Sequence, residues 1–320
     1  MTANTVLALS PRVVTGHLPM VYEFGGKKQN LDIRAMIILV VLCASWGLQQ
    51  VAIKIASQGV SPILQSGIRS IGATILVTMW MLIRREPMFA RDGTLWWGIA
   101  AGTLFAVEFL LIYLGLGFTN ASRAVIFLYM SPFVVALGAQ LFIPGESLRL
   151  MQVVGLCSAF TGIVVAFYES MYLPTSRMLV GDAMLAVAAV LWGATTVLIK
   201  ASPLAGIASS KTLLYQLAVS ALVLPVASIA AGEAGVVSLA PLIVASLVYQ
   251  VVWIATITYL AWFWLLRHYP ASRLASFTFL TPIFGVLAGG FLLDELITKS
   301  LLLALALVGT GIYMVNQSKV

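Results

Sequence analysis

The chain has 320 residues, of which 61% are hydrophobic and only 9% are charged. A soluble domain carries about 25% charged residues, so this composition excludes an ordinary soluble fold. The formal net charge of +7 comes without a basic stripe interleaved with aromatics, so no nucleic-acid partner is expected.

The first thirty residues are polar enough to lie outside a membrane. A secretory signal peptide needs an apolar core of about 7–15 residues and a small-residue cleavage site, and this stretch has neither. We therefore interpret residues 1–32 as a cytoplasmic N-terminal tail.

From residue 33 onward, long apolar runs alternate with short linkers that contain glycine and proline. A helix needs about 20 mostly apolar residues to cross the hydrocarbon of a bilayer, and ten segments meet this criterion. The linkers leave no room for a soluble domain. The predicted spans are 33–56, 62–83, 94–116, 120–142, 148–167, 179–200, 208–231, 239–266, 270–292 and 298–317.

The chain contains an internal repeat. The stretch ASRAVIFLYMSP at 121–132 returns 150 residues later as ASRLASFTFLTP at 271–282. Two shorter matches align spans 1 and 5 with spans 6 and 10: WG-x6-K at 46–54 and 192–200, and Thr-Gly-Ile at 161–163 and 310–312. Because the repeated unit has five spans, an odd number, its two copies must cross the membrane in opposite directions.

The predicted fold class is an all-α integral membrane protein with ten transmembrane helices, arranged as two inverted five-helix repeats around a central cavity. The predicted divisions are a tail (1–32), a first repeat (33–167), an outer linker (168–178), a second, inverted repeat (179–317) and a cytoplasmic C-terminus (318–320). With the N-terminus inside, thirteen of the 18 Lys and Arg residues fall on the inner side. This bias predicts a multi-pass membrane protein with both termini cytoplasmic.

The ten spans, the paired WG-x6-K motif and the paired ASR-x8-[ST]P motif resemble the EamA-type drug/metabolite transporter superfamily, in particular bacterial exporters of amino acids. The resemblance covers about residues 33–317. It implies a central cavity lined mainly by helices other than the fifth and tenth, which pack outside, and alternating access by rocking and bending. It also implies an acidic residue after span 4 or 9, here Glu146, or Glu295 beside Asp294, to which we assign no substrate role.

Arg69 and Glu108 are the two charges placed deep in predicted spans. Burying such a charge at the centre of a span costs about 2.5–3.5 kcal/mol, so each needs a partner or water. Both lie roughly 10–12 Å from the outer ends of their helices. Three readings stay open: an ion pair between spans 2 and 3, independent solvation, or a place at the cavity edge. At the edge, Arg69 would face a substrate carboxylate and Glu108 an ammonium group or a proton.

Spans 1 and 6 each carry a polar and aromatic stripe on one helical face. The stripes are Trp46, Gln50 and Lys54, and Trp192, Thr196 and Lys200. We predict that the tryptophans and their polar neighbours line the cavity, with helix packing as the alternative for the rings. Lys54 and Lys200 are expected to snorkel towards opposite membrane faces, with a gating contact as the alternative.

Further candidate substrate-binding residues are aromatic. They are Tyr113 in span 3, Tyr129 in span 4, Tyr215 in span 7, and Tyr249, Trp253 and Tyr259 in span 8. A chamber of such rings with a few polar groups suits a small amphipathic or aromatic solute better than a nucleotide sugar. The alternative is that these rings simply belong to the ordinary aromatic content of a membrane protein.

Spans 4 and 9 have proline near their middle, Pro132 and Pro282, which removes a helical hydrogen bond. We predict hinges at both positions, with static kinks as the alternative, and expect neighbouring Ser131 or Thr281 to satisfy the freed carbonyl groups. Three charges close to span starts are interpreted as surface features: Arg123 and Arg273 as interfacial anchors, and Asp182 as a helix cap.

The predicted function is secondary transport that exports small organic solutes across the cytoplasmic membrane, with aromatic or bulky apolar amino acids and related metabolites as substrates. The alternatives are a multidrug or cationic-toxin exporter and, more distantly, a nucleotide-sugar or phosphate-ester exchanger. An enzyme is not expected, because His17 and His268 stand apart from any carboxylate or cysteine cluster. No cofactor and no metal site are predicted, and Cys43 and Cys157 lie within apolar runs. The expected partners are a small-molecule substrate and lipid, with the chain as a monomer.

Overall fold

The computed structural model of the chain describes residues 31–168, 173–293 and 300–317. Within these ranges ten helical segments are long and apolar enough to cross a membrane, and they match the ten predicted spans. The predicted tail over 1–30, Asp294, Glu295, Lys299, part of the outer linker (169–172) and residues 318–320 lie outside the described residues.

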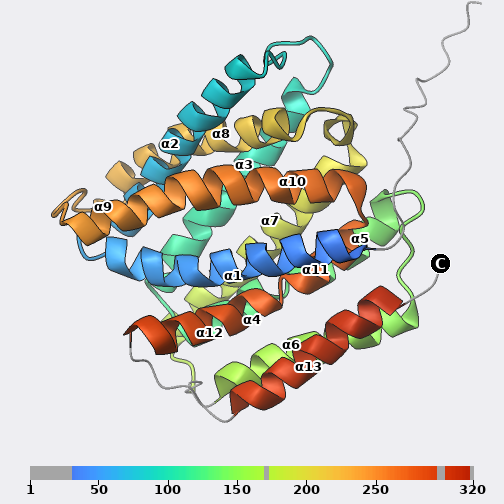
Figure 1. Ribbon diagram of the computed structural model, residues 1–320. Helices are drawn as coiled ribbons and strands as arrows, with labels where there is room; N and C mark the ends of the chain where they lie inside the picture. The colour runs from blue at the N-terminus through green and yellow to red at the C-terminus, as the bar shows by residue number, and fades with distance from the viewer. Residues whose placement is uncertain (1–30, 169–172, 294–299, 318–320) are drawn as a thin grey trace, which may run out of the picture.

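Seven spans are single helices and three are interrupted (Figure 1). The single helices are α1 (Ile33–Ala56), α2 (Pro62–Ile83), α3 (Leu95–Leu116), α6 (Leu150–Phe167), α7 (Ser176–Ala201), α8 (Ser209–Ala230) and α13 (Ser300–Gln317). The interrupted spans are α4 (Ala121–Leu128) with α5 (Ser131–Phe142), α11 (Ala271–Phe277) with α12 (Leu280–Leu293), and α9 (Pro241–Val248), the π-helix η3 (Tyr249–Thr258) and α10 (Tyr259–His268). A short 3₁₀ turn, η2 (Pro203–Gly206), follows α7.

Several helices begin where the sequence supplies a cap. The side chains of Asp32, Asn120 and Thr175 each accept a hydrogen bond from the backbone N–H three residues later, at α1, α4 and α7. Such a bond satisfies one of the free N–H groups of the first turn. Pro62 and Pro241 begin α2 and α9, where the missing N–H of proline costs no helical bond.

One end of the bundle holds the start of α1 and the end of α7. There the Tyr269 hydroxyl, in the α10–α11 linker, donates to Asp32 at 3.0 Å. Lys200, in the last turn of α7, forms an ion pair with Glu146 of the α5–α6 linker at 3.2 Å. We call this the basic end, because it gathers most of the basic residues that the sequence analysis placed on the inner side.

The opposite end holds the start of α7. There Thr119, in the α3–α4 linker, donates to Asp182 in the second turn of α7 at 2.8 Å. The first helices of the two repeats, α1 and α7, therefore run in opposite directions. This confirms the predicted inverted arrangement.

Two cross-repeat bonds join corresponding parts of the two repeats. Tyr269 lies 150 residues after Thr119, which is the offset of the ASR repeat, whereas Asp182 lies four residues beyond the position that matches Asp32 in the WG-x6-K alignment. We call Asp32–Tyr269 and Asp182–Thr119 the paired ties. Each joins the first helix of one repeat to the linker before the ASR helix of the other repeat.

Asp182 also forms an ion pair with Arg123 of α4, and both side chains are almost fully enclosed. The interpretation of Arg123 as an interfacial anchor and of Asp182 as a helix cap is therefore corrected. Thr175 caps α7 instead, and it lies seven residues before Asp182. Each of these charges is buried because the other neutralises it within the protein.

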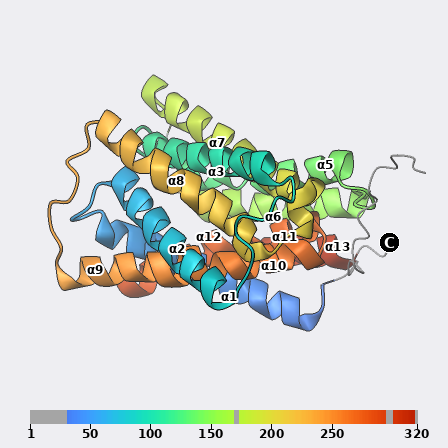
Figure 2. The ribbon, with the colours of Figure 1, turned by 90° about the horizontal axis from the view of Figure 1, so that it is seen from above.

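The fifth and tenth spans, α6 and α13, pack against each other at the edge of the bundle (Figures 1 and 2). Glycines allow this close approach: a Cβ atom built on Gly155 would lie 2.7 Å from the carbonyl oxygen of Gly311, and one on Gly162 would lie 2.8 Å from that of Ala304. Small residues at such contacts are the usual basis of helix association in lipid.

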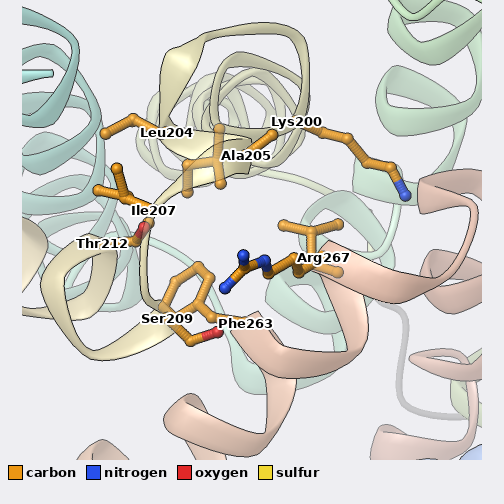
Figure 3. A pocket seen from close by; sticks show the side chains of 10 residues that line it. Lys200, Leu204, Ala205, Ile207, Ser209, Thr212, Phe263 and Arg267 are labelled. Atoms are coloured by element: carbon orange, nitrogen blue, oxygen red, sulfur yellow. The ribbon is translucent and has the colours of Figure 1, made fainter. Parts of the chain in front are cut away.

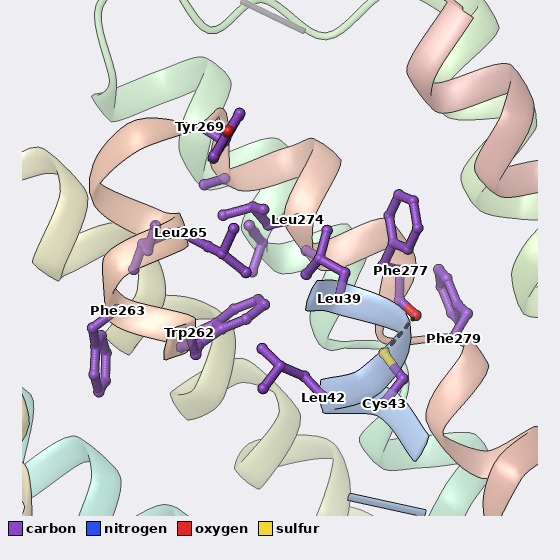
Figure 4. Packing of buried hydrophobic residues seen from close by; sticks show 14 of the residues in the cluster. Leu39, Leu42, Cys43, Trp262, Phe263, Leu265, Tyr269, Leu274, Phe277 and Phe279 are labelled. Carbon is purple, nitrogen blue, oxygen red and sulfur yellow. Dashed lines mark hydrogen bonds between the residues drawn. The ribbon is translucent and has the colours of Figure 1, made fainter. Parts of the chain in front are cut away.

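A large buried cluster surrounds α1, α10 and the break between α11 and α12 (Figure 4). The thiol of Cys43 donates to the carbonyl oxygen of Phe277, the last residue of α11, at 3.2 Å. The hydroxyl of Thr278 donates to the carbonyl of Ala275 at 2.7 Å. Cys43 and Thr278 therefore bond the carbonyl groups at the break, whereas the predicted Thr281 hydroxyl has no hydrogen-bond partner within the described residues.

An ion pair joins the α2–α3 linker to α8 at the basic end. Lys211 forms an ion pair with Asp92 at 2.7 Å, and the Thr94 hydroxyl donates to the same carboxylate at 2.6 Å. Desolvation alone would raise the pKa of Asp92, but the hydrogen bonds from Lys211 and Thr94 outweigh it and lower the pKa to about 2.

Candidate functional site

A cavity of about 240 Å³ lies inside the bundle between the two repeats. Its walls come from α1, α3 and α4 of the first repeat and from α7, α8, α10 and α12 of the second. Among the described residues, α6 and α13 contribute no lining side chain. Concave, mainly apolar chambers with a few polar groups are the usual form of small-molecule sites.

The stripes of α1 and α7 both reach this cavity. Trp46 and Gln50 line it from α1, and Trp192 and Thr196 line it from α7. The lysines that continue each stripe do not line it. Lys54 is exposed near the end of α1, and Lys200 is buried at the basic end. Lys200 therefore does not snorkel, because its ammonium group meets Glu146 inside the protein.

One face of α3 forms a further wall. Phe105, Glu108, Phe109, Ile112 and Tyr113 line the cavity and follow the i, i+3, i+4, i+7 spacing of a helical face. Among the described residues that line the cavity, Glu108 is the one with a charged side chain. Its Oε2 atom is buried and has no hydrogen-bond partner in the described part of the chain.

Arg69 lies outside the cavity. Its side chain is fully enclosed, with the guanidinium carbon 4.2 Å from the centre of the Phe109 ring and Nη2 3.3 Å from the Ser66 hydroxyl. Phe109 both contacts Arg69 and lines the cavity, whereas Arg69 is not among the lining residues. Arg69 and Glu108 interact electrostatically. Their side chains do not form an ion pair within 4.0 Å in the described structure, so the ion pair that the sequence suggested as one alternative is not formed.

Rings from α1, α3 and α10 meet edge to face at one side of the cavity. The ring centres of Trp46 and Tyr259 are 6.3 Å apart, those of Trp46 and Trp262 are 5.6 Å apart, and those of Phe105 and Tyr259 are 6.1 Å apart. The indole N–H of Trp46 donates to the Thr258 hydroxyl at 2.9 Å. This bond fixes the indole of Trp46, which lines the chamber.

The breaks in spans 4 and 9 lie beside the cavity. Tyr129, at the end of α4, lines the chamber and contacts Trp192 with ring centres 6.0 Å apart. Pro132 is the second residue of α5, and Pro282 is the third residue of α12. Pro282 lines the cavity, and Pro132 does not lie among the lining residues. Both prolines follow directly on interruptions of the helix, as the sequence predicts for a kink.

Three predicted aromatic residues do not line the cavity. The Tyr215 hydroxyl lies 3.2 Å from that of Thr94 at the basic end, while the next residue, Gln216, faces the chamber. Tyr249 donates to the carbonyl of Ser45 at 3.0 Å, and Trp253 donates to the Ser45 hydroxyl at 2.9 Å.

Tyr249 and Trp253 therefore face the side of α1 that lies away from the chamber. Their polar atoms bond Ser45 of α1. The Trp253 side chain reaches the outside of the bundle, where 39% of the residue is exposed. The side chains of this span that do reach the cavity come later, from α10.

The sequence did not predict several residues that line the cavity: Phe105, Phe109, Trp262 and Phe263. The α3 pair carried a usable signal, because both phenylalanines share a helical face with Glu108. The α10 pair carried none, since residues 259–266 are apolar or aromatic on every face.

Comparisons with known proteins agree with this architecture. The model of the EamA-like transporter family matches residues 33–168 and 179–317. A solved crystal structure superposes with a TM-score of 0.77 at 18% identity, over 89% of this chain and 99% of the other, which shows a shared fold.

Two curated bacterial relatives match over most of their length. The uncharacterized transporter YvbV of Bacillus subtilis is 25% identical over 90% of this chain and 93% of the relative. The probable amino-acid metabolite efflux pump of Escherichia coli is 26% identical over 88% and 92%. On the family match to both halves, the chain belongs to the EamA-like transporter family of membrane transporters.

Proposed function

We propose that the protein is a secondary transporter that exports small organic solutes with an ammonium group, in the first place aromatic or bulky apolar amino acids and related metabolites. The observation that carries this proposal is the single chamber between the repeats, in which aromatic rings surround one carboxylate, Glu108. The relative from Escherichia coli that is named a probable amino-acid metabolite efflux pump supports the outward direction.

The chemistry of the walls fits such a solute. The buried, unpartnered Oε2 of Glu108 is an acceptor for an ammonium group, and charge-assisted bonds of this kind are the stronger ones. The faces of Trp46, Trp192 and Tyr259 suit an apolar or aromatic side chain. The amides of Gln50 and Gln216 offer N–H donors to a carboxylate.

A cationic-toxin exporter is the second candidate, and the position of Arg69 favours it. Because Arg69 does not line the chamber, its described walls offer a carboxylate and aromatic faces without a lysine or arginine, an arrangement suited to quaternary ammonium groups. Counterflow into proteoliposomes separates the two candidates. Labelled phenylalanine should accumulate against unlabelled phenylalanine, and accumulation of a labelled quaternary ammonium compound alone would replace the amino-acid proposal.

Glu108→Gln tests the recognition of the ammonium group. Losing a charge-assisted hydrogen bond costs about 1.5–3 kcal/mol, so the apparent affinity for phenylalanine in counterflow should fall about tenfold or more. Glu86→Gln, in the α2–α3 linker, is the matched control and should leave this affinity unchanged. Unchanged affinity in Glu108→Gln contradicts the proposal. Normal counterflow with loss of pH-driven uptake would assign Glu108 to proton coupling instead.

Alternating access is proposed to use the interruptions that precede Pro132 and Pro282. Both lie at matching places in the two repeats and divide a span into two shorter helices that can change their relative angle. We propose a monomer in the cytoplasmic membrane, because one chain supplies both walls of the chamber, and we place the basic end on the cytoplasmic side.

A further inference from the structure

A second, much smaller cavity lies at the basic end, between α7, η2, α8 and α10 (Figure 3). Its volume is about 20 Å³, and a cavity needs roughly 10–15 Å³ to hold one water molecule. It therefore has room for little more than a water molecule. Ile199 of α7 and Phe263 of α10 line both this cavity and the central one.

These two side chains stand between the central chamber and the basic end. Both are apolar and nearly enclosed, with 5% of Ile199 and 7% of Phe263 exposed. A solute that moves between the chamber and the basic end along this line must displace them. Neither side chain has a hydrogen-bonding atom, so no side-chain hydrogen bond is lost when the two side chains move apart.

The helices that carry these two side chains are held together by Lys200. It directly follows Ile199 in the last turn of α7, and in Figure 3 its side chain extends away from the small cavity. Its ammonium group donates to the backbone carbonyl of Tyr269, in the linker that follows α10, and forms the ion pair with Glu146. Moving α7 away from α10 therefore breaks the bond between Lys200 and Tyr269.

Glu146, which belongs to the first repeat, contacts both Lys200 and the start of α11. Its two carboxylate oxygens accept hydrogen bonds from the backbone N–H of Ala271, the first residue of α11, at 3.1 and 2.9 Å. The side chains of Lys200 and Glu146 are only 2% and 10% exposed. Because both charges lie mostly out of water, the pair separates readily only where opening lets water reach them.

We infer that Ile199 and Phe263 form the gate through which solutes pass between the central chamber and the basic end, and that the Lys200–Glu146 pair is the latch that keeps it closed. The inference rests on the proposed transport function, because a gate for solutes has a role only in a transporter. Its test does not depend on any substrate, so the two can fail separately.

The test measures how fast the chamber is reached from the basic end. Thr195, a lining residue of α7, is replaced by cysteine in a chain that also carries Cys43→Ala and Cys157→Ser. A charged, membrane-impermeant thiol reagent is added to oriented vesicles from each side in turn, without substrate. In Lys200→Met and Glu146→Gln, modification from the basic end should become about tenfold faster or more, because the latch is lost.

Three further variants complete the test. Phe263→Ala should raise the same rate while leaving the ion pair in place, so it decides the outcome if a latch variant fails to fold. The double variant Lys200→Met/Glu146→Gln should add little to either single change, because both remove one interaction. Lys211→Met removes a comparable ion pair on α8, with Asp92, and should leave the rate unchanged. Equal rates in wild type, latch variants and Phe263→Ala, or an equal rise in Lys211→Met, would overturn the inference.

Discussion

Arg123 and Asp182 show how this bundle accommodates charge away from water. Arg123 contacts the Asp182 carboxylate through Nε and Nη2, and Thr119 donates to one of the same oxygens. Removing one member of such a pair leaves the other charge enclosed without compensation, which is far more costly than losing a surface contact.

Arg123→Gln should therefore destabilise the protein by about 3–5 kcal/mol, seen as a lower midpoint of thermal unfolding in detergent. The double variant Arg123→Met/Asp182→Leu should be more stable than Arg123→Gln, since no charge then remains buried. Arg177→Gln is the control, because Arg177 is exposed on the same end of the molecule and bonds a single backbone carbonyl. A midpoint for Arg123→Gln that equals the control value would count against a buried pair.

Single residues of the site could be predicted only where a helical face is marked by several residues. Each tryptophan of the two stripes lines the cavity together with the polar residue one turn later, whereas the lysines of the same stripes do not. Arg69 could not be placed, since the Phe109 ring that covers it belongs to a different helix. Trp253 could not be placed either, because its partner Ser45 lies 208 residues away in sequence.

At the scale of helices, the contact between α6 and α13 depends on glycine. A Cβ built on Gly311 would collide with the backbone carbonyl of Gly155 and the backbone nitrogen of Ala159. The sequence repeat marked this glycine through the shared Thr-Gly-Ile segments, although it did not reveal that the two helices touch each other.

Gly311→Leu should force the two helices apart and destabilise the protein by about 1–3 kcal/mol, the usual cost of overpacking. Gly309→Leu is a close control, because nothing lies within 4 Å of a Cβ built two residues earlier in the same helix. Thermal unfolding in detergent compares the two. Similar midpoints for both variants would show that the α6–α13 contact adds little to stability.

The spans themselves could be predicted from apolar length, and the breaks in spans 4 and 9 from their prolines. The π-helix η3 could not. Its residues, Tyr249–Thr258, have the same apolar character as an ordinary span, and no proline or glycine interrupts them. In a π-helix the backbone hydrogen bonds join residues five positions apart. The Thr256 hydroxyl also bonds the carbonyl five residues earlier, that of Val251. Sequence periodicity assumes a uniform helix, so it misplaces side chains in such a segment.

At the scale of the whole molecule, the inverted arrangement followed from counting alone, because five spans per repeat require opposite directions. The number of spans could not predict which side chains hold the two repeats together. Those contacts join residues such as Lys200 and Glu146 that no motif links in the sequence.

The orientation proposed for this bundle predicts that both termini lie in the cytoplasm. Epitope tags at residues 1 and 320 should be unreachable by antibody in intact spheroplasts and reachable in inverted vesicles, because ten spans return the chain to its starting side. A cysteine at Ala234, in the α8–α9 linker of the opposite end, should give the reverse pattern with an impermeant thiol reagent. Tags on different sides of the membrane would contradict the ten-span topology.

The paired ties have a consequence for how such a molecule can be assembled. The Asp32–Tyr269 and Asp182–Thr119 contacts join corresponding parts of the two repeats, so one five-helix unit contains both halves of such a contact. Two identical copies of that unit, inserted antiparallel about a twofold axis, would form one contact of this kind twice, which is the definition of an isologous interface. The bonds that now hold one chain together thus have the approximate symmetry of a homodimer.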